Sequence, residues 1–419
     1  MRPWARRALL RRAIAAQEST EQRLRGAMFR SVVKHVLLLT VPTLIFCLVA
    51  AEVFFHTVAP ACETPLMAFD RAHRMLRFDV ESRRDGVFTF GNFARHRSRW
   101  RVNNEGWNCA VDYETPRARR QPLIALIGDS FVEGLQVDVD RHMDAVLRSL
   151  IGPTHDVYAF GISGAPLSQY LLMSRYVAAR FDPSVLVFVI VHNDFTESIR
   201  ELEPKPLLLQ VSLKPDTPEE VPPVEYHPNR WRRLLGRSAG VRFFYLNAGV
   251  SMRKFRTLAR RRTVADELDQ AFEHREEIHR VTRHLVGLIR AENPTRRIIF
   301  TMVPERFDAS GERPDAARAA WLHDLIRDAA AEHSCDFVDL NAAFLARYRE
   351  EGARFDFDED AHWNATGQET AAREIYAKLL AMGVLDSGRN RGASSEEPAG
   401  PGGAIMTSAD GHPLRAARP

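Results

Sequence analysis

The most apolar stretch of the chain lies near its N-terminus. Residues 36–51 contain no charged side chain, Glu52 interrupts the run, and the stretch continues without charge through Val58. Residues 36–58 thus make a segment of 23 residues, and about 20 apolar residues in a helix cross a bilayer core of about 30 Å. The pattern predicts one N-terminal transmembrane helix over 36–58, with Glu52 toward the far interface, where a charge costs less than at mid-bilayer.

Two other structures fit the same stretch. It could be the core helix of a soluble domain, although no neighbouring apolar segment is placed to wrap it. It could also be a cleaved signal peptide, because Ala59-Pro60-Ala61 has the small-x-small form of a cleavage site. The basic leader of residues 1–34 is long for a signal peptide, and this favours the transmembrane helix.

From residue 121 onward, strand-length apolar runs alternate with segments of helical period. Residues 122–127 form a continuous apolar run, whereas Met143, Val146, Leu147 and Leu150 share one helical face. Strands are predicted at 122–127, 156–160, 185–191, 297–303 and 337–340. Helices are predicted at 143–150, 167–180 and 264–292, and another follows the strand at 297–303 and ends at about 332. The last helix starts near Thr366, where Thr366 and Glu369 have capping-box spacing. Strands separated by helices imply an α/β fold of three layers, α/β/α, around a mostly parallel sheet.

Three other segments frame or interrupt this α/β domain of residues 121–385. Residues 59–120, rich in Arg and aromatic side chains, are predicted to be a lead-in with one or two short strands. Residues 197–235 contain seven prolines, which forbid long regular elements and predict an insertion that acts as a lid or groove wall. Residues 386–419 have no apolar period and are predicted to be disordered.

The charge of the chain is concentrated ahead of the apolar stretch. The chain has 58 Lys and Arg against 54 Asp and Glu, a net charge of +4, but residues 1–34 carry nine basic and two acidic side chains and the other 385 residues sum to −3. For a bacterial chain, the positive-inside rule then predicts a cytoplasmic tail over 1–35 and a periplasmic body anchored by a single pass in the inner membrane. A nucleic-acid partner is not predicted, because the basic run 260–262 lacks interleaved aromatic residues.

Polar residues stand at the ends of three predicted strands, where parallel sheets bind their ligands. The first strand leads into Gly128-Asp129-Ser130, the second into the glycine-bounded turn 161–164, and the third into Asn193. Farther along, Glu359 and Asp360 precede His362. An acid just before a histidine can orient the ring through Nδ1 and leave Nε2 as a base for a serine.

Counted together, these four blocks resemble the SGNH/GDSL hydrolase family over about residues 121–382. The resemblance implies that Ser130 is the nucleophile and His362 the general base. It implies an oxyanion hole made by the backbone N–H groups of Ser130 and Gly161 and the side-chain amide of Asn193. It implies no cofactor and no metal.

The resemblance leaves the acid of the triad open between two residues. The usual spacing points to Glu359, relatives also use the spacing of Asp360, and we favour Asp360. The chain departs from the family pattern at Ala159, where the second block usually has asparagine, and at Val191, which is often glycine. Neither departure removes a catalytic group.

Other signals in the chain do not predict a site. Ser163 lacks the second glycine of a nucleophile elbow. Residues 274, 279 and 284 are histidines in five-residue steps, which point in different directions on a helix, so they are predicted to be solvated rather than metal ligands. The four cysteines have no metal-ligand spacing; Cys47 lies in the apolar stretch, and Cys62, Cys109 and Cys335 either remain free thiols or include one disulfide in an undetermined pairing.

The sequence therefore predicts a membrane-anchored serine esterase that acts outside the cytoplasm through an acyl-serine intermediate. Its expected substrate is an acylated glycan or lipid, and polysaccharide-assembly proteins are possible partners. An O-acyltransferase that modifies an exported polysaccharide would use the same residues but exclude water. A glycan-binding or assembly subunit without activity is the alternative of a different class, and the full set of catalytic side chains argues against it.

Overall fold

The structure is a computed structural model of the 419-residue chain. It describes residue 17 and residues 22–214, 217–227, 236–247, 263–307 and 312–385. The predicted disordered segment 386–419, most of the first 21 residues and parts of the proline-rich insertion lie outside the described residues.

A five-stranded sheet forms the centre of the body, and every neighbouring pair in it is parallel. The strand order is β11-β10-β7-β5-β6, with β5 at Leu123–Gly128, β6 at Asp156–Gly161, β7 at Val185–Ile190, β10 at Arg297–Met302 and β11 at Asp336–Val338. All residues of β5 and β7 are buried. A strand covered on both faces reads as a continuous apolar run, which is why the sequence revealed these strands.

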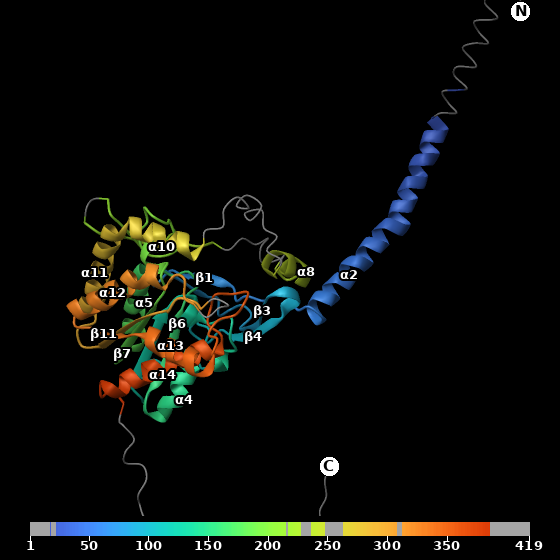
Figure 1. Ribbon diagram of the computed structural model, residues 1–419. Helices are drawn as coiled ribbons and strands as arrows, with labels where there is room; N and C mark the ends of the chain where they lie inside the picture. Colours follow the sequence, from blue (N-terminus) through green and yellow to red (C-terminus); the bar gives the residue numbers. More distant parts are fainter. Residues whose placement is uncertain are drawn as a thin grey trace, which may run out of the picture.

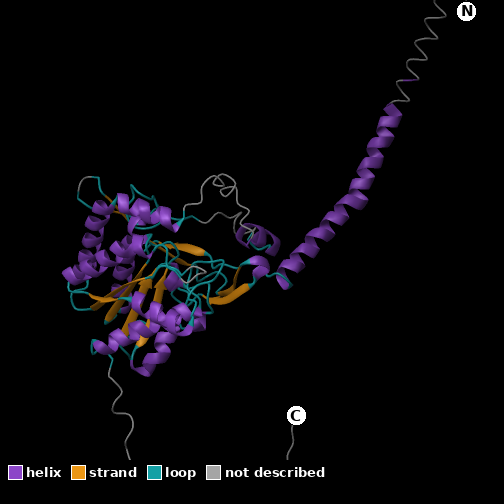
Figure 2. Cartoon of the chain, in the orientation of Figure 1, coloured by secondary structure: helices purple, strands orange, loops and turns teal. Residues whose placement is uncertain are grey.

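Helices cover both faces of the sheet, as Figures 1 and 2 show. Along β5, Ile124 and Leu126 point into one apolar core, whereas Leu123, Ala125 and Ile127 point into the other. The first core is closed by α4 (Met143–Ile151), α13 (Leu340–Glu351) and α14 (Ala365–Ala381), and the second by α5 (Leu167–Phe181), α10 (Val264–Glu273), α11 (Arg275–Glu292) and α12 (Ala316–Glu332). The predicted three-layer α/β/α fold is confirmed.

Several predicted boundaries are wrong. The helix expected over 264–292 breaks at His274, whose φ of −108° and ψ of 25° are not helical, so that α10 and α11 are separate. The capping box expected at Thr366 is absent, because Asn364 caps α14 by accepting hydrogen bonds from the next backbone N–H groups. The strand expected to run through residue 340 stops at Val338, since the carboxylate of Asp339 caps α13.

The lead-in segment is more regular than expected. It contains two antiparallel hairpins, β1–β2 (Met67–Asp70 and Met75–Phe78) and β3–β4 (Asp85–Phe90 and His96–Arg101), rather than one or two short strands. The proline-rich insertion likewise holds a short hairpin, β8–β9 (Gln210–Ser212 and Glu219–Val221). Short hairpins of mixed polarity give a weak apolar signal, so the sequence pattern did not separate their strands.

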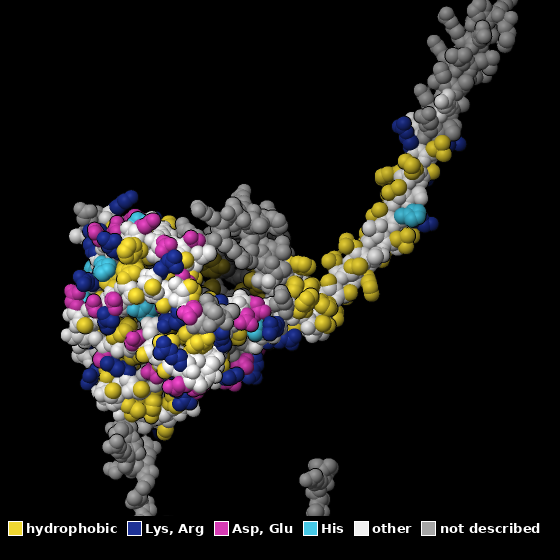
Figure 3. Space-filling model, in the orientation of Figure 1, with side chains coloured by type: hydrophobic (Ala, Val, Ile, Leu, Met, Phe, Trp, Pro, Cys, Tyr) yellow, Lys and Arg dark blue, Asp and Glu magenta, His cyan; other side chains and the backbone are white. Residues whose placement is uncertain are grey.

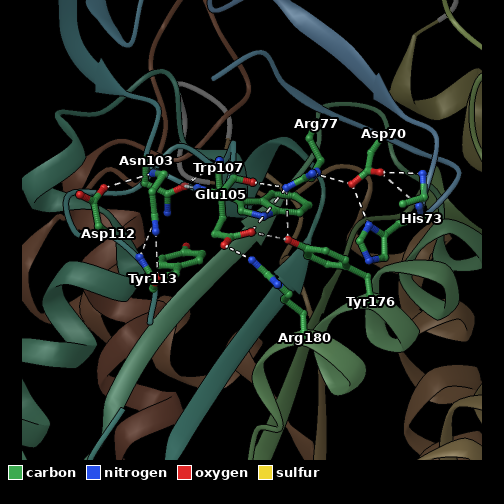
Figure 4. Close-up of polar contacts among 12 residues, drawn as sticks. Asp70, His73, Arg77, Asn103, Glu105, Trp107, Asp112, Tyr113, Tyr176 and Arg180 are labelled. Carbon is green, nitrogen blue, oxygen red and sulfur yellow. Dashed lines mark hydrogen bonds and ion pairs between the residues drawn. The ribbon is translucent and has the colours of Figure 1, made fainter. Parts of the chain in front are cut away.

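A polar network fastens the first hairpin to the sheet domain (Figure 4). The Glu105 carboxylate lies 2.8 Å from an Arg180 guanidinium nitrogen and accepts a hydrogen bond of 3.3 Å from the Tyr176 hydroxyl, both on α5. The Arg77 guanidinium of β2 lies 3.7 Å from the same carboxylate and pairs with Asp70 at 2.5 Å. The lead-in is therefore packed onto α5 rather than loosely attached.

The N-terminal apolar segment is a long helix that extends away from the body (Figure 1). It runs over Gln22–Thr57 and includes a π-helical turn at Val36–Thr40 and helix α2 at Val41–Thr57. None of its most apolar 18-residue window is buried, so the core-helix alternative is wrong. The helix is long and apolar enough to cross a membrane, as an anchor or a signal sequence would be. It also begins earlier than predicted, within the basic tail.

Candidate active site

Ser130 stands where β5 passes into a single helical turn, α3 (Ser130–Glu133). The Asp129 carboxylate caps this turn by accepting a hydrogen bond of 2.9 Å from the backbone N–H of Phe131. The Ser130 hydroxyl lies 3.1 Å from the same carboxylate. This short strand-to-helix turn holds the hydroxyl at the carboxyl edge of the sheet.

His362 reaches Ser130 from the loop that precedes α14. Its Nε2 atom lies 2.7 Å from the Ser130 Oγ atom, and its Nδ1 atom is hydrogen-bonded to the Asp360 carboxylate. Asp360 also accepts a 2.9 Å hydrogen bond from the backbone N–H of His362. Phe131 flanks the imidazole, with 5.1 Å between ring centroids. The three residues thus form a serine–histidine–carboxylate chain of hydrogen bonds.

The pKa values in this chain move in opposite directions. Burial lowers the pKa of His362, but the hydrogen bond and negative charge of Asp360 outweigh it and leave that pKa above its ordinary value. Burial raises the pKa of Asp360, yet its hydrogen bonds to His362 bring it below the ordinary value of an aspartate. Asp360 therefore stays ionised where His362 takes up a proton, and the pair favours an imidazole that accepts a proton from Ser130.

Glu359, the other candidate for the acid, points elsewhere. Its carboxylate lies 3.0 Å from Nε2 of His96 and 3.5 Å from a guanidinium nitrogen of Arg95. Both partners belong to the β3–β4 hairpin or its turn. The structure therefore brings Asp360 to His362 and leaves Glu359 to hold the same loop against the lead-in.

Asn193 begins the turn after β7, where helix α6 (Asp194–Glu197) starts. In this turn, the Glu197 carboxylate pairs with the ammonium of Lys205 at 2.6 Å. The side-chain amide nitrogen of Asn193 carries two N–H groups that can donate to a ligand. A lysine of the proline-rich insertion therefore contacts the helical turn that begins at Asn193.

The Gly161 N–H was expected to face the site as a donor of the oxyanion hole, and the structure places it differently. It ends the edge strand β6, and the next residue, Ile162, donates to Gly128 on β5. Alternate N–H groups of a strand point to opposite sides, so the Gly161 N–H points outward, as that of Ala159 does toward Tyr113. A Cβ atom at Gly161 would lie 2.1 Å from the backbone nitrogen of Glu133, so this glycine lets α3 pack on the strand.

Glu133 is a buried acid of the site that the sequence reasoning missed. Its side chain accepts hydrogen bonds from the hydroxyl and the backbone N–H of Ser163, the latter at 3.3 Å. Burial raises its pKa to about 7. The available signal was its position three residues after Ser130, since residues i and i+3 lie on one face of a helical turn.

The other candidate ligands remain apart. Among the described residues, no group of three or more His, Cys, Asp or Glu side chains could hold a metal ion. The sequence predicted a solvated His279, but its ring stacks on Trp321 with 5.8 Å between ring centroids and is therefore partly covered. All four cysteines are free thiols in the structure.

Comparison with known proteins identifies the family. Residues 126–370 match the model of the GDSL-like lipase/acylhydrolase family, and no curated protein sequence matches the chain. Similar solved structures include a lipolytic G-D-S-L family protein from Veillonella parvula (12% identity, 62% of this chain and 98% of that chain, TM-score 0.34) and a lipase/acylhydrolase from Enterococcus faecalis (14%, 62%, 97%, 0.34). The family match spans more than half of the chain and includes Ser130, Asn193 and His362. The chain therefore belongs to the GDSL-like lipase/acylhydrolase family, as an SGNH-type esterase.

Proposed function

We propose that this esterase is anchored in the inner membrane and removes acyl groups from a glycan or lipid on the periplasmic side. The 2.7 Å contact between Ser130 Oγ and His362 Nε2, with Asp360 on the opposite ring nitrogen, carries the proposal for an acyl-serine mechanism. The apolar helix Gln22–Thr57 with basic residues at its N-terminal end supports the location.

Each residue of the hydrogen-bonded chain has a role in this mechanism. As the Ser130 oxygen attacks the ester carbonyl, His362 Nε2 takes the hydroxyl proton and Asp360 stabilises the imidazolium that forms. The collapse of the tetrahedral intermediate expels the alcohol, which receives that proton. Water then attacks the acyl-serine, again with His362 as base, and releases the carboxylic acid.

The tetrahedral intermediate needs hydrogen-bond donors for its negative oxygen, and each such donor is worth about 10²–10³ in rate. We assign this role to the backbone N–H of Ser130 and the side-chain amide of Asn193. For the third donor we propose Gly164 in place of Gly161. Gly164 lies in the half-exposed turn beyond β6 and has a φ of +72°, whereas Gly161 is buried under Glu133.

The test uses the full-length protein in detergent. The native chain and the variants Ser130→Ala and His362→Ala are assayed on a chromogenic acetate ester. Ser212→Ala, at the half-exposed end of β8, is the matched control. Both site variants should lose turnover while their circular dichroism stays native, and the control should retain it. Full activity in either site variant would remove the serine mechanism.

Adding an acceptor glycan separates the possible reactions. Acetate release that is independent of the glycan supports the esterase. Faster release with formation of acylated glycan would identify an acyltransferase instead. If mass spectrometry detects no acyl group on Ser130 and no product forms, the chain is a binding subunit.

A further inference from the structure

Glu52 is the one charged residue within the apolar stretch 36–58, and its partners come from a distant part of the chain. Its carboxylate accepts hydrogen bonds from the backbone N–H groups of Ala239 (2.6 Å) and Gly240 (3.1 Å) and from the hydroxyl of Ser238 (2.8 Å). A carboxylate in an apolar helix is costly unless it is hydrogen-bonded. These three donors therefore explain how the stretch tolerates a glutamate.

The donors belong to a segment that we call the juxtamembrane segment, residues 236–247. It contains α8 (Ala239–Arg242) and a π-helical turn at Phe243–Asn247. Figure 1 shows α8 beside the end of α2 that meets the body. The contact is also apolar, because the Phe55 ring of α2 stacks on Phe243, with 4.2 Å between centroids, and meets Phe244 edge-on at 5.7 Å.

The opposite side of the juxtamembrane segment is fastened to the body. Asn247 accepts a hydrogen bond of 2.8 Å from the backbone N–H of Cys62 and donates to the Thr89 carbonyl on β3 at 3.0 Å. The Arg242 guanidinium lies 3.5 Å from the Glu63 carboxylate. The segment thus connects the long helix to the lead-in at a fixed place.

A third face of the segment is apolar and exposed. Val241, Phe244 and Tyr245 are 40%, 53% and 48% exposed, and their spacing of i, i+3 and i+4 places them on one helical face. On the neighbouring helix, Val53 is 56% exposed, and Val58, which follows the end of α2, is 62% exposed. In Figure 3, hydrophobic side chains gather where the long helix meets the body.

The depth of this apolar face follows from the helix geometry. Glu52 lies 16 residues beyond Val36, and at about 1.5 Å per residue this is about 24 Å, close to the far side of a hydrocarbon core of about 30 Å. The juxtamembrane segment docks at this level, where aromatic side chains are favoured. In the anchoring proposed above, lipid surrounds the neighbouring surface of α2, so a lipid surface is the occupant that fits the exposed face.

We propose that residues 236–247 lie in the outer interface of the membrane, with Val241, Phe244 and Tyr245 inserted into the lipid beside the transmembrane helix. Glu52 anchors the segment by capping its helical turn, and Asn247 fastens it to the lead-in. The catalytic domain is then held close to the membrane rather than free on a tether. This inference rests on the membrane anchoring proposed above.

Photo-crosslinking tests the proposal with the native full-length protein. The protein is reconstituted in phosphatidylcholine and phosphatidylglycerol vesicles that contain a phospholipid with a photoreactive group on its acyl chain, and adducts are mapped by mass spectrometry. We expect adducts on 36–58 and on 241–245, and none on Phe272, an aromatic residue that is 52% exposed. Phe272 belongs to α10, a helix that Figure 1 shows apart from α8. Adducts on 36–58 without any on 241–245 overturn the interfacial segment while the anchor stands.

Failure of the anchor gives a different result. If the apolar stretch is a cleaved signal peptide, intact mass measurement would show a mature chain that begins near residue 62, and this chain would carry no lipid adducts. The paired substitution Val241→Asp with Phe244→Asp should remove the adducts from 241–245 and leave those on 36–58 unchanged. Retained turnover of a chromogenic acetate ester would show that this variant is folded, since neither residue belongs to the site.

A second variant tests the hydrogen bonds of Glu52. Glu52→Leu keeps the stretch apolar but removes the acceptor of the Ala239 and Gly240 N–H groups. Hydrogen exchange of these two amides should become faster in the variant, whereas exchange in β5 should not change. Equal exchange in both proteins would contradict the capping role of Glu52.

Discussion

The sharpest test of the site concerns Asp360 and its neighbour Glu359. Asp360→Asn keeps the shape of the side chain but removes the negative charge that faces His362 Nδ1. The amide can also donate to Nδ1, which forces the other ring nitrogen to carry the proton. His362 Nε2 would then hold a hydrogen toward Ser130 and could not accept the hydroxyl proton.

The size of the loss follows from what Asp360 does in the structure. It accepts hydrogen bonds from both Nδ1 and the backbone N–H of His362, and its side chain is only 23% exposed. Loss of the correct tautomer and of the charge that stabilises the imidazolium should lower kcat by about 10²–10⁴. This equals about 3–5 kcal/mol at about 1.36 kcal/mol per tenfold.

Glu359→Gln is the matched control. Within the described residues, the Glu359 carboxylate pairs with His96 at 3.0 Å and with Arg95 at 3.5 Å. Half-exposed ion pairs of this kind contribute about 1 kcal/mol or less. Its kcat/KM on a chromogenic acetate ester should therefore change by less than about tenfold. If Asp360→Asn retained native turnover, or lost less than Glu359→Gln, Asp360 could not be the acid.

Three further predictions follow from other contacts. Because the negative Asp360 raises the pKa of His362, turnover should fall with decreasing pH at an apparent pKa above about 6.5. Asp360→Asn should move this fall to lower pH, and an unchanged pH profile would show that Asp360 does not act on the pKa of His362. Gly161→Ala would bring its Cβ against the backbone of Glu133 and should cost about 1–3 kcal/mol of unfolding free energy, measured with urea. Glu105→Gln weakens the network of Figure 4 and should lower the free energy of unfolding by about 1–2 kcal/mol without changing kcat/KM. A variant that unfolds at the same temperature as the native protein would show that the network does not stabilise the fold.

The sequence predicted those site residues whose position follows from the parallel direction of the strands. Ser130 and Asn193 each follow a buried strand, and parallel strands end at one edge of the sheet. Their placement at one edge of the sheet therefore required no knowledge of side-chain packing. His362 could be added because an acid near it in the chain can orient its ring.

The choice between Glu359 and Asp360 could not be made in this way. Both carboxylates lie within three residues of His362, and the loop has no periodicity that fixes which one faces the ring. The structure shows which one it is, since His96 on β4 contacts Glu359 whereas Asp360 faces His362. A contact between residues 263 positions apart leaves no trace in a local pattern.

Gly161 shows the same limit at the level of the backbone. A glycine after a strand is compatible both with a donor to the substrate and with close packing of a helix. Only the hydrogen bond from Ile162 to β5 determines the direction of the Gly161 N–H. Glu133 was missed for a related reason, because its burial depends on α3 lying over the end of β6.

The lead-in contacts both the juxtamembrane segment and the loop that carries His362. On one side, the β3–β4 hairpin receives the juxtamembrane segment through the bond from Asn247 to Thr89. On the other side, it holds the catalytic loop through Glu359 and through the contact of Phe90 with Phe357, with 4.9 Å between centroids. The β3–β4 hairpin therefore touches both the segment that packs on the apolar helix and the loop that carries His362. Because these contacts lie at separate places on the hairpin, the lead-in can hold the juxtamembrane segment and the catalytic loop independently of each other.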